Sequence, residues 1–193
     1  MAATPYLSYD RLMARARDPA ADLTQAFAGV LSRFHTLGLP GKELARLIQR
    51  FFPGDVPLLE ALADDGENCY QFRQEEHADL VDLLLEYRTQ PGEESAWLAH
   101  TVATACLGEN HLWQDMGLSD RDKLSALLAT HFTSLYVRNT ANMKWKKFFY
   151  KQLCERADVN LCKAPTCAVC MDYAACFGPE DGQPLPANEV RQL

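Results

Sequence analysis

The feature that most constrains this chain of 193 residues is a group of cysteines near its C-terminal end. Five of its seven cysteines lie between positions 154 and 176. Four of these follow the pattern Cys162-x4-Cys167-x2-Cys170-x5-Cys176. Four thiols within fifteen residues allow a short loop to wrap a compact inorganic core, because its turns can aim successive sulfurs inward. The pattern therefore predicts a metal-binding loop at this end of the chain.

The spacing also bears on which metal the loop binds. Iron-sulfur clusters are held by cysteine thiolates at irregular spacings, often with a proline nearby, which here is Pro165. A structural zinc site usually combines two separated Cys-x2-Cys or Cys/His units, and only Cys167 and Cys170 stand in that relation. An odd number of cysteines without an export signal weighs against disulfides. We expect a 4Fe-4S or 3Fe-4S cluster, with zinc as the alternative.

Two further residues are candidate metal ligands. Cys154 lies at helical spacing from Lys144, Lys147 and Lys151, and cationic neighbours favour the thiolate that ligates metal. A half-buried structural cysteine is an equally good interpretation of Cys154. His111 lies among polar residues at an expected helix break, from which it could approach the cluster.

The segment 143–151 alternates basic and aromatic residues. Positions 134–156 hold six basic residues and one acid in an otherwise acidic protein. The pattern predicts a helix that turns its aromatic residues toward the protein and presents Lys144, Lys147 and Lys151 as a cationic face. Such a face attracts an anionic cargo such as molybdate or docks an acidic partner. The simpler interpretation is the solvated side of a core helix.

The rest of the chain predicts an all-α protein with a single helical domain of about six helices. Apolar residues recur at helical spacing, proline and glycine separate the runs, and no segment shows convincing strand alternation. A Ser119 to Asp122 capping box precedes the fifth run, and the sixth contains neither proline nor glycine. The expected helices cover about 23–34, 44–51, 75–88, 95–108, a fifth run that follows Asp122 and carries Leu124, Leu127 and Leu128, and 135–156. We divide the chain into a helical domain (1–156), the four-cysteine cluster loop (157–178) and a flexible C-terminal tail (179–193).

Composition and charge restrict the classes of function. A formal net charge of -7 argues against nucleic-acid binding, which requires a basic surface. The first twenty residues contain no apolar run of the kind found in a secretory signal or a membrane span. We therefore expect a cytoplasmic protein that binds neither nucleic acid nor membrane.

Three segments together resemble one known family. These are residues 105–118 (ACLGENHLWQDMGL), residues 142–155 (NMKWKKFFYKQLCE), and the four-cysteine array with Phe177 and Gly178 that follow it. They resemble the NifQ family over roughly positions 95–180, while the N-terminal hundred residues are similar only in length and helical character. The specificity rests on the cysteine spacing combined with the Met-Lys-Trp-Lys-Lys-Phe-Phe run.

The resemblance implies a nitrogen-fixation accessory protein, not an enzyme, that carries a Mo-Fe3-S4 cluster and donates molybdenum for iron-molybdenum cofactor biosynthesis. It implies the nitrogenase iron protein and the cofactor-assembly scaffold as partners. Three irons of such a cuboid require three thiolates, and a replaceable fourth ligand would hold molybdenum at the remaining corner. Which residue contacts molybdenum stays open at this point.

Two other functions compete with this one. An all-helical chain with a four-cysteine loop is similar in part to DNA-repair glycosylases of the endonuclease III superfamily. In that superfamily, however, the first cysteine gap is six residues rather than four, and Glu43 stands where the second hairpin glycine would be. The acidic balance also counts against it. An iron-sulfur redox sensor or regulatory protein remains the alternative.

Overall fold

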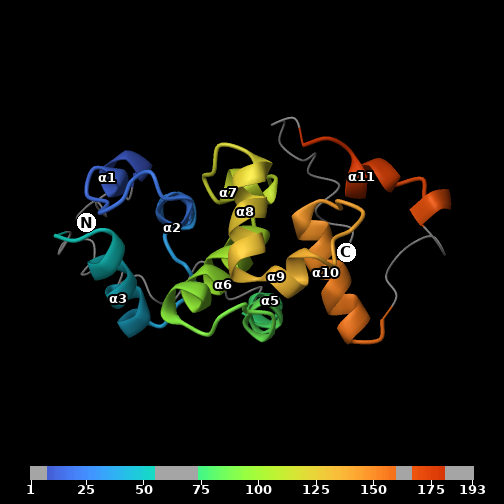
Figure 1. Cartoon of the computed structure of the whole chain (residues 1–193), viewed down its shortest axis with the longest axis horizontal. Helices are drawn as coiled ribbons and strands as arrows, with labels where there is room; N and C mark the ends of the chain where they lie inside the picture. The colour runs from blue at the N-terminus through green and yellow to red at the C-terminus, as the bar shows by residue number, and fades with distance from the viewer. Residues whose placement is uncertain (1–7, 55–73, 160–166, 181–193) are drawn as a thin grey trace, which may run out of the picture.

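The computed structural model describes residues 8–54, 74–159 and 167–180, and within these ranges the chain is helical with no strand. Figure 1 shows an elongated arrangement, with α1 to α3 at one end and α10 and α11 at the other. The predicted all-α fold class is confirmed. None of the helices in the described ranges combines the length and apolar character that crossing a bilayer would require.

The centre of the fold is α6, Glu93–Cys106, which packs between α2, Asp22–Phe34, and α5, Gln74–Glu86. Ten of the 14 residues of α6 are buried, Cys106 among them. A helix buried on nearly all sides must be apolar or small all round, and Ala99, Ala103 and Ala105 are such residues. The core is therefore built around one helix.

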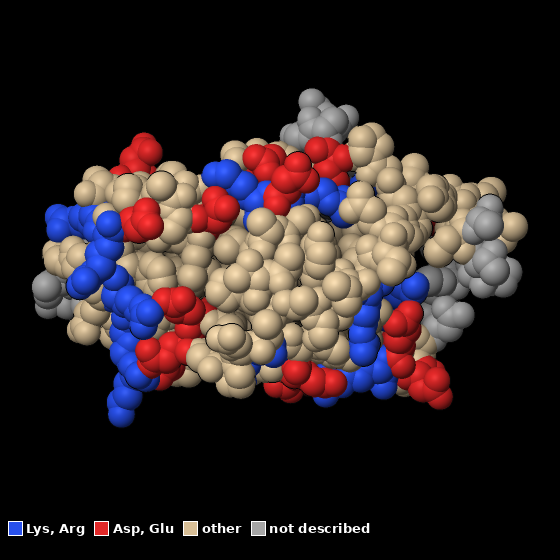
Figure 2. Space-filling view, viewed as in Figure 1, with Lys and Arg blue, Asp and Glu red and all other residues tan. Residues whose placement is uncertain are grey.

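The N-terminal end adds two helices to this centre. Helix α1, Tyr9–Met13, packs on α2, and α3 spans Gly41–Phe51. Phe51 at the end of α3 contacts Phe27 and Trp97 edge to face, at ring-centroid distances of 4.9 and 6.3 Å. On the face seen in Figure 2, acidic and basic side chains are mixed along the edges and the middle is largely uncharged.

Three helices lead from α6 toward the cysteines: α7, Leu112–Asp115, α8, Arg121–His131, and α9, Thr133–Tyr136. The expected capping box at α8 is wrong in its residues. Asp120 is the N-cap, and its carboxylate accepts from the backbone N–H of Lys123 at 2.9 Å, while the Ser119 hydroxyl donates to Asp120. An aspartate side chain caps a helix as well as a serine does, so the predicted start of the helix is correct although the capping residue is Asp120 and not Ser119.

The long helix expected over 135–156 is also wrong. Helix α9 ends at Tyr136 and α10 spans Trp145–Arg156. Between them the Asn139 side chain bonds both the backbone N–H and the backbone C=O of Met143, each at 2.8 Å, and Asn142 adopts a left-handed φ of 54°. Asparagine side chains compete with helical hydrogen bonds, so the helix breaks here without proline or glycine.

The other five expected helices are confirmed within a few residues of their predicted bounds, as α2, α3, α5, α6 and α8. Sequence periodicity missed α1, α7, α9 and α11, Tyr173–Phe177. Each of these has five residues or fewer, which is too short to display a helical repeat.

A close backbone contact joins α2 to the end of α7. A Cβ added at Gly29 would lie 2.2 Å from the carbonyl oxygen of Met116 and 2.7 Å from the Cα of Gly117. Gly117 itself has a φ of 68°, a conformation that glycine adopts without a steric penalty. The contact therefore depends on glycine at both positions, and it holds α7 against α2.

Gly29→Ala is expected to lower the free energy of unfolding by about 1–3 kcal/mol, because the added methyl meets backbone that cannot swing away. The matched control is Gly41→Ala at the start of α3, where no heavy atom lies within 4 Å of the new methyl. Urea denaturation of both variants checks the difference, and equal stability of the two would contradict the contact.

Candidate metal-cluster site and an adjoining buried charge network

The described part of the cysteine array is a tight turn followed by a short helix. Residues Cys167–Val169 form one 3-10 turn, and the backbone N–H of Cys170 donates to the carbonyl of Cys167 at 3.3 Å. Helix α11 then carries Cys176 near its end. The turn places Cys167 and Cys170 close in space, as a Cys-x2-Cys unit requires. Cys162 lies outside the described residues.

Cys176, the last cysteine, is anchored to the start of α10. The backbone N–H of Lys144, the N-cap of α10, donates to the carbonyl of Cys176 at 2.8 Å. Cys176 and Phe177 are partly buried against the core, and the ring of Phe177 stacks on Tyr173 with centroids 4.6 Å apart. Helix α11 and the start of α10 are therefore held together.

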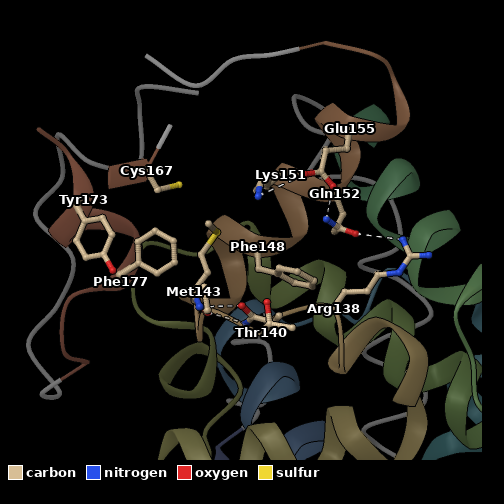
Figure 3. A pocket seen from close by; sticks show the side chains of 12 residues that line it. Arg138, Thr140, Met143, Phe148, Lys151, Gln152, Glu155, Cys167, Tyr173 and Phe177 are labelled. Atoms are coloured by element: carbon tan, nitrogen blue, oxygen red, sulfur yellow. Dashed lines mark hydrogen bonds and ion pairs between the residues drawn. The ribbon is translucent and has the colours of Figure 1, made fainter. Parts of the chain in front are cut away.

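A cavity of about 400 Å³ lies between α10 on one side and the cysteine turn with α11 on the other (Figure 3). Cys167 lines it from the cysteine turn, and its sulfur points toward Lys151 of α10. Phe148, Met143 and Phe177 supply apolar walls. A partly apolar cavity of this size is typical of small-molecule and cofactor sites.

The polar side chains of this cavity are held by one another. Lys151 pairs with Glu155 at 3.4 Å, Gln152 donates to Glu155 at 2.6 Å, and Arg138 donates to Gln152 at 3.5 Å. The Arg138 guanidinium also lies over the ring of Tyr87, 4.5 Å from its centroid. Two cations and one carboxylate thus line the cavity, which favours an anionic occupant.

The described cysteines have the chemistry of ligands, but they are not gathered into a site. Within the described ranges, no disulfide joins any of Cys106, Cys154, Cys167, Cys170 and Cys176 to another. Across the ranges that the structure describes, no three His, Cys, Asp or Glu side chains come close enough together to hold a metal ion. The donor set suits an iron-sulfur or zinc centre, whereas its arrangement here is open.

The two optional ligands lie apart from the cavity. Cys154 is half-buried near the end of α10 and does not line it. His111 is 5% exposed, caps α7, and has its Nδ1 4.0 Å from the Glu180 carboxylate. The positions of Cys154 and His111 do not favour either residue as a metal ligand. Both assignments stay predictions.

The predicted cationic face is reduced by burial. Trp145, Phe148 and Phe149 are buried as expected, but Lys144 is only 8% exposed. Lys147 and Lys151 are half-exposed. Docking through this face stays a prediction, and it would depend on the latter two lysines.

A buried charge network beside the site was not predicted from the sequence. Asp115 is completely buried and accepts from Lys146 at 2.6 Å and from the backbone and side-chain amides of Asn110 at 3.0 and 2.9 Å. Arg33 of α2 lies 3.2 Å away, and Lys146 also donates to the Gly108 carbonyl at 2.8 Å. These bonds join α2, α7 and α10.

One sequence signal could have identified Lys146. Lys146 shares a helix face with Phe149 and Leu153, which contact the core. A lysine on a core-facing side of a helix needs a buried counter-charge, so this position predicts a buried acidic partner. No local pattern points to Asp115 as that partner, because the two are 31 positions apart in the chain.

A second buried carboxylate lies nearby. The Glu180 side chain is 5% exposed and pairs with Arg121 of α8 at 2.9 Å. Burial raises the pKa of this carboxyl, although Arg121, Lys144 and Lys146 each act to lower it. Glu180 belongs to the tail predicted over 179–193, so at least its second residue is docked, while 181–193 lie outside the described residues.

Asp115→Asn is expected to cost about 3 kcal/mol of stability, because it leaves the Lys146 ammonium in a buried site without its carboxylate. Asp79→Asn on the exposed side of α5 is the control and should change stability by less than about 0.5 kcal/mol. Thermal and urea unfolding measure both. If the two variants unfold alike, the network does not stabilise the fold.

The comparisons with known proteins all indicate the same family. A model of the NifQ family matches residues 20–178, so the match begins in the N-terminal helices. The chain is 43% identical to Protein NifQ of Azotobacter vinelandii, over 76% of this chain and 79% of that protein. It is 36% identical to Protein NifQ of Rhodobacter capsulatus, over 83% and 86%, and 39% identical to Protein NifQ of Klebsiella pneumoniae, over 73% and 85%. No solved structure gives a significant match.

Proposed function

Because this chain belongs to the NifQ family of nitrogen-fixation proteins, we propose that it carries a molybdenum-iron-sulfur cluster and donates the molybdenum for nitrogenase cofactor assembly. The observation that carries the proposal is the cavity beside α10, which the Cys167 thiol lines. In this role the protein is a carrier without turnover, works in the cytoplasm, and hands its cargo to the nitrogenase iron protein and the assembly scaffold.

The proposed ligands are Cys162, Cys167, Cys170 and Cys176. Thiolates suit iron and sulfide, and no disulfide joins Cys167, Cys170 and Cys176 to one another. Because the described thiols are not gathered, the array would close around the cluster as it binds. The hydrogen bond from Lys144 to the Cys176 carbonyl would keep one end of the array in place during closure.

The open arrangement fits a donor better than a permanent structural centre. A donor must hold its metal long enough to assemble the cluster and then release it to a partner. The described thiols of the proposed site lie at a short turn and on a five-residue helix, so the site could open without disturbing the buried core around α6.

Anaerobically purified protein from cells grown with molybdate is expected to be brown and to contain both iron and molybdenum. Incubation with the assembly scaffold should lower the molybdenum content of this protein and raise that of the scaffold, as measured by elemental analysis after the two are separated. Iron without molybdenum would contradict the donor role and favour the redox-sensor alternative. Electron paramagnetic resonance of the same sample reports the cluster type.

Cys167→Ala is expected to abolish the visible absorption of the cluster while leaving far-ultraviolet helicity nearly intact, because the helical core does not depend on the array. Val169→Ala is the matched control, since Val169 lies in the same turn, is 67% exposed and cannot ligate metal. Equal cluster absorption in the two variants would remove Cys167 from the ligand set. Global unfolding of Cys167→Ala would show that the metal is structural.

A further inference from the structure

The cavity beside α10 is lined by more cations than carboxylates. Among the residues that line it, three are charged: Arg138, Lys151 and Glu155. Lys151 belongs to α10, and Figure 3 shows its ammonium on the side of the cavity toward which the Cys167 sulfur points. Lys147, one turn earlier on the same helix, does not line the cavity. Lys151 is therefore the lysine of α10 that an occupant of the cavity meets.

The second cation of the cavity is held by other partners. The Arg138 guanidinium lies 4.5 Å from the ring centroid of Tyr87 and donates to the side-chain oxygen of Gln152 at 3.5 Å. Figure 3 shows Arg138 on the opposite side of the cavity from Cys167. Arg138 thus orients Gln152, and the cation on the side of the thiol is Lys151.

The ion pair that Lys151 makes is a weak one. Its ammonium lies 3.4 Å from the carboxylate of Glu155, one turn further along α10, and the two side chains are 41% and 54% exposed. An exposed pair of this kind contributes little to stability, because water solvates both charges. The four-carbon stem of lysine is also flexible. The ammonium can therefore leave Glu155 at a small cost in free energy.

Glu155 keeps a hydrogen bond when Lys151 leaves. The side-chain amide of Gln152 donates to Glu155 Oε2 at 2.6 Å, whereas Lys151 pairs with Oε1 of the same carboxylate. Gln152 is buried, and Arg138 donates to its oxygen. The carboxylate therefore has a donor that does not depend on the position of Lys151.

The walls next to Lys151 are apolar. Met143 and Phe148 line the cavity and are 6% and 4% exposed, and Phe177 lines it from α11. Buried apolar walls exclude water and so strengthen the interaction between charges beside them. An anion held at Cys167 would lack water on this side and would be stabilised by a facing ammonium.

We propose that Lys151 is the counter-charge of the cluster that Cys167 helps to hold, and that its ammonium turns from Glu155 to the cluster when the cluster binds. Thiolate ligands bring more negative charge than an iron-sulfur core has positive charge, so the bound cluster is an anion. A lysine ammonium has no lone pair for a metal, so Lys151 is a positioning residue and not a ligand. The inference rests on the proposed function, which supplies the cluster.

This role has a measurable consequence for the reduction potential of the cluster. Reduction makes the cluster more negative, so a nearby cation favours the reduced state and raises the potential. The carboxylate of Glu155 has the opposite effect. Lys151 and Glu155 therefore act on the potential with opposite signs, which a merely structural role of either side chain does not produce.

The test is a dithionite titration, with redox mediators, of the full-length protein purified anaerobically with its cluster. Lys151→Met is expected to lower the equilibrium constant for reduction about tenfold, which is about 59 mV for a one-electron couple, and Lys151→Arg should restore most of it. Glu155→Gln is expected to raise the constant. Arg156→Met removes a cation of the same helix that pairs with Glu86 at 3.3 Å outside the cavity, so it should leave the potential unchanged.

Equal potentials in Lys151→Met and Arg156→Met would overturn the role of Lys151. If Lys151→Met binds no cluster, Glu155→Gln decides, since an unchanged potential in that variant also overturns the proposal. The result is separable from that of the donor role. Unshifted potentials in a molybdenum-containing cluster overturn the role of Lys151 alone, the expected shifts in a cluster without molybdenum overturn donation alone, and protein without any cluster overturns both.

Discussion

Asp115 is a fully buried carboxylate, and the packing of α2, α7 and α10 beside the candidate site depends on its partners. An isolated charge in a protein interior costs several kcal/mol, so the fold must bring cations to it. Lys146 comes from α10 and Arg33 from α2, while Asn110 supplies two further donors from the loop before α7. These helices therefore have little freedom to slide past one another.

The position of α10 follows from this network. With Lys146 tied to Asp115, the aromatic residues of α10 pack inward, and Trp145 stacks on Tyr136 at a centroid distance of 5.7 Å. The same register places Lys144 beside Glu180 and turns Lys151 toward the cysteine turn. One helix thus contributes side chains both to the cavity beside the cysteine turn and to the buried charge network.

The position of α10 has a functional consequence under the proposed role. A molybdenum donor must combine its metal with iron and sulfide and then release the product. The hydrogen bond from the Lys144 backbone N–H to the Cys176 carbonyl ties α11 to the start of α10. The buried network ties α10 to α2 and α7, whereas the turn at Cys167 lies outside that network.

Much of the outline was determined by local pattern. The five longer helices follow from apolar periodicity with proline and glycine between them, because a helix buries the residues on one side of a 3.6-residue repeat. The cysteine spacing predicts a thiolate site from the chain itself, since ligands within fifteen residues need no distant partner. The family likewise followed from two short motifs and that spacing.

Tertiary structure decided what depends on distant partners. The break between α9 and α10 follows from Asn139 bonding to Met143 rather than from a breaker residue. The burial of Lys144 and the pairing of Lys146 with Asp115 join segments about thirty residues apart, and Glu180 reaches Arg121 across 59 positions. Charge in a sequence indicates a solvated face, and only packing shows which charges are desolvated and must find a counter-charge. The sequence by itself therefore determined the five longer helices and predicts the metal chemistry, whereas the fold determined which charged side chains are buried together.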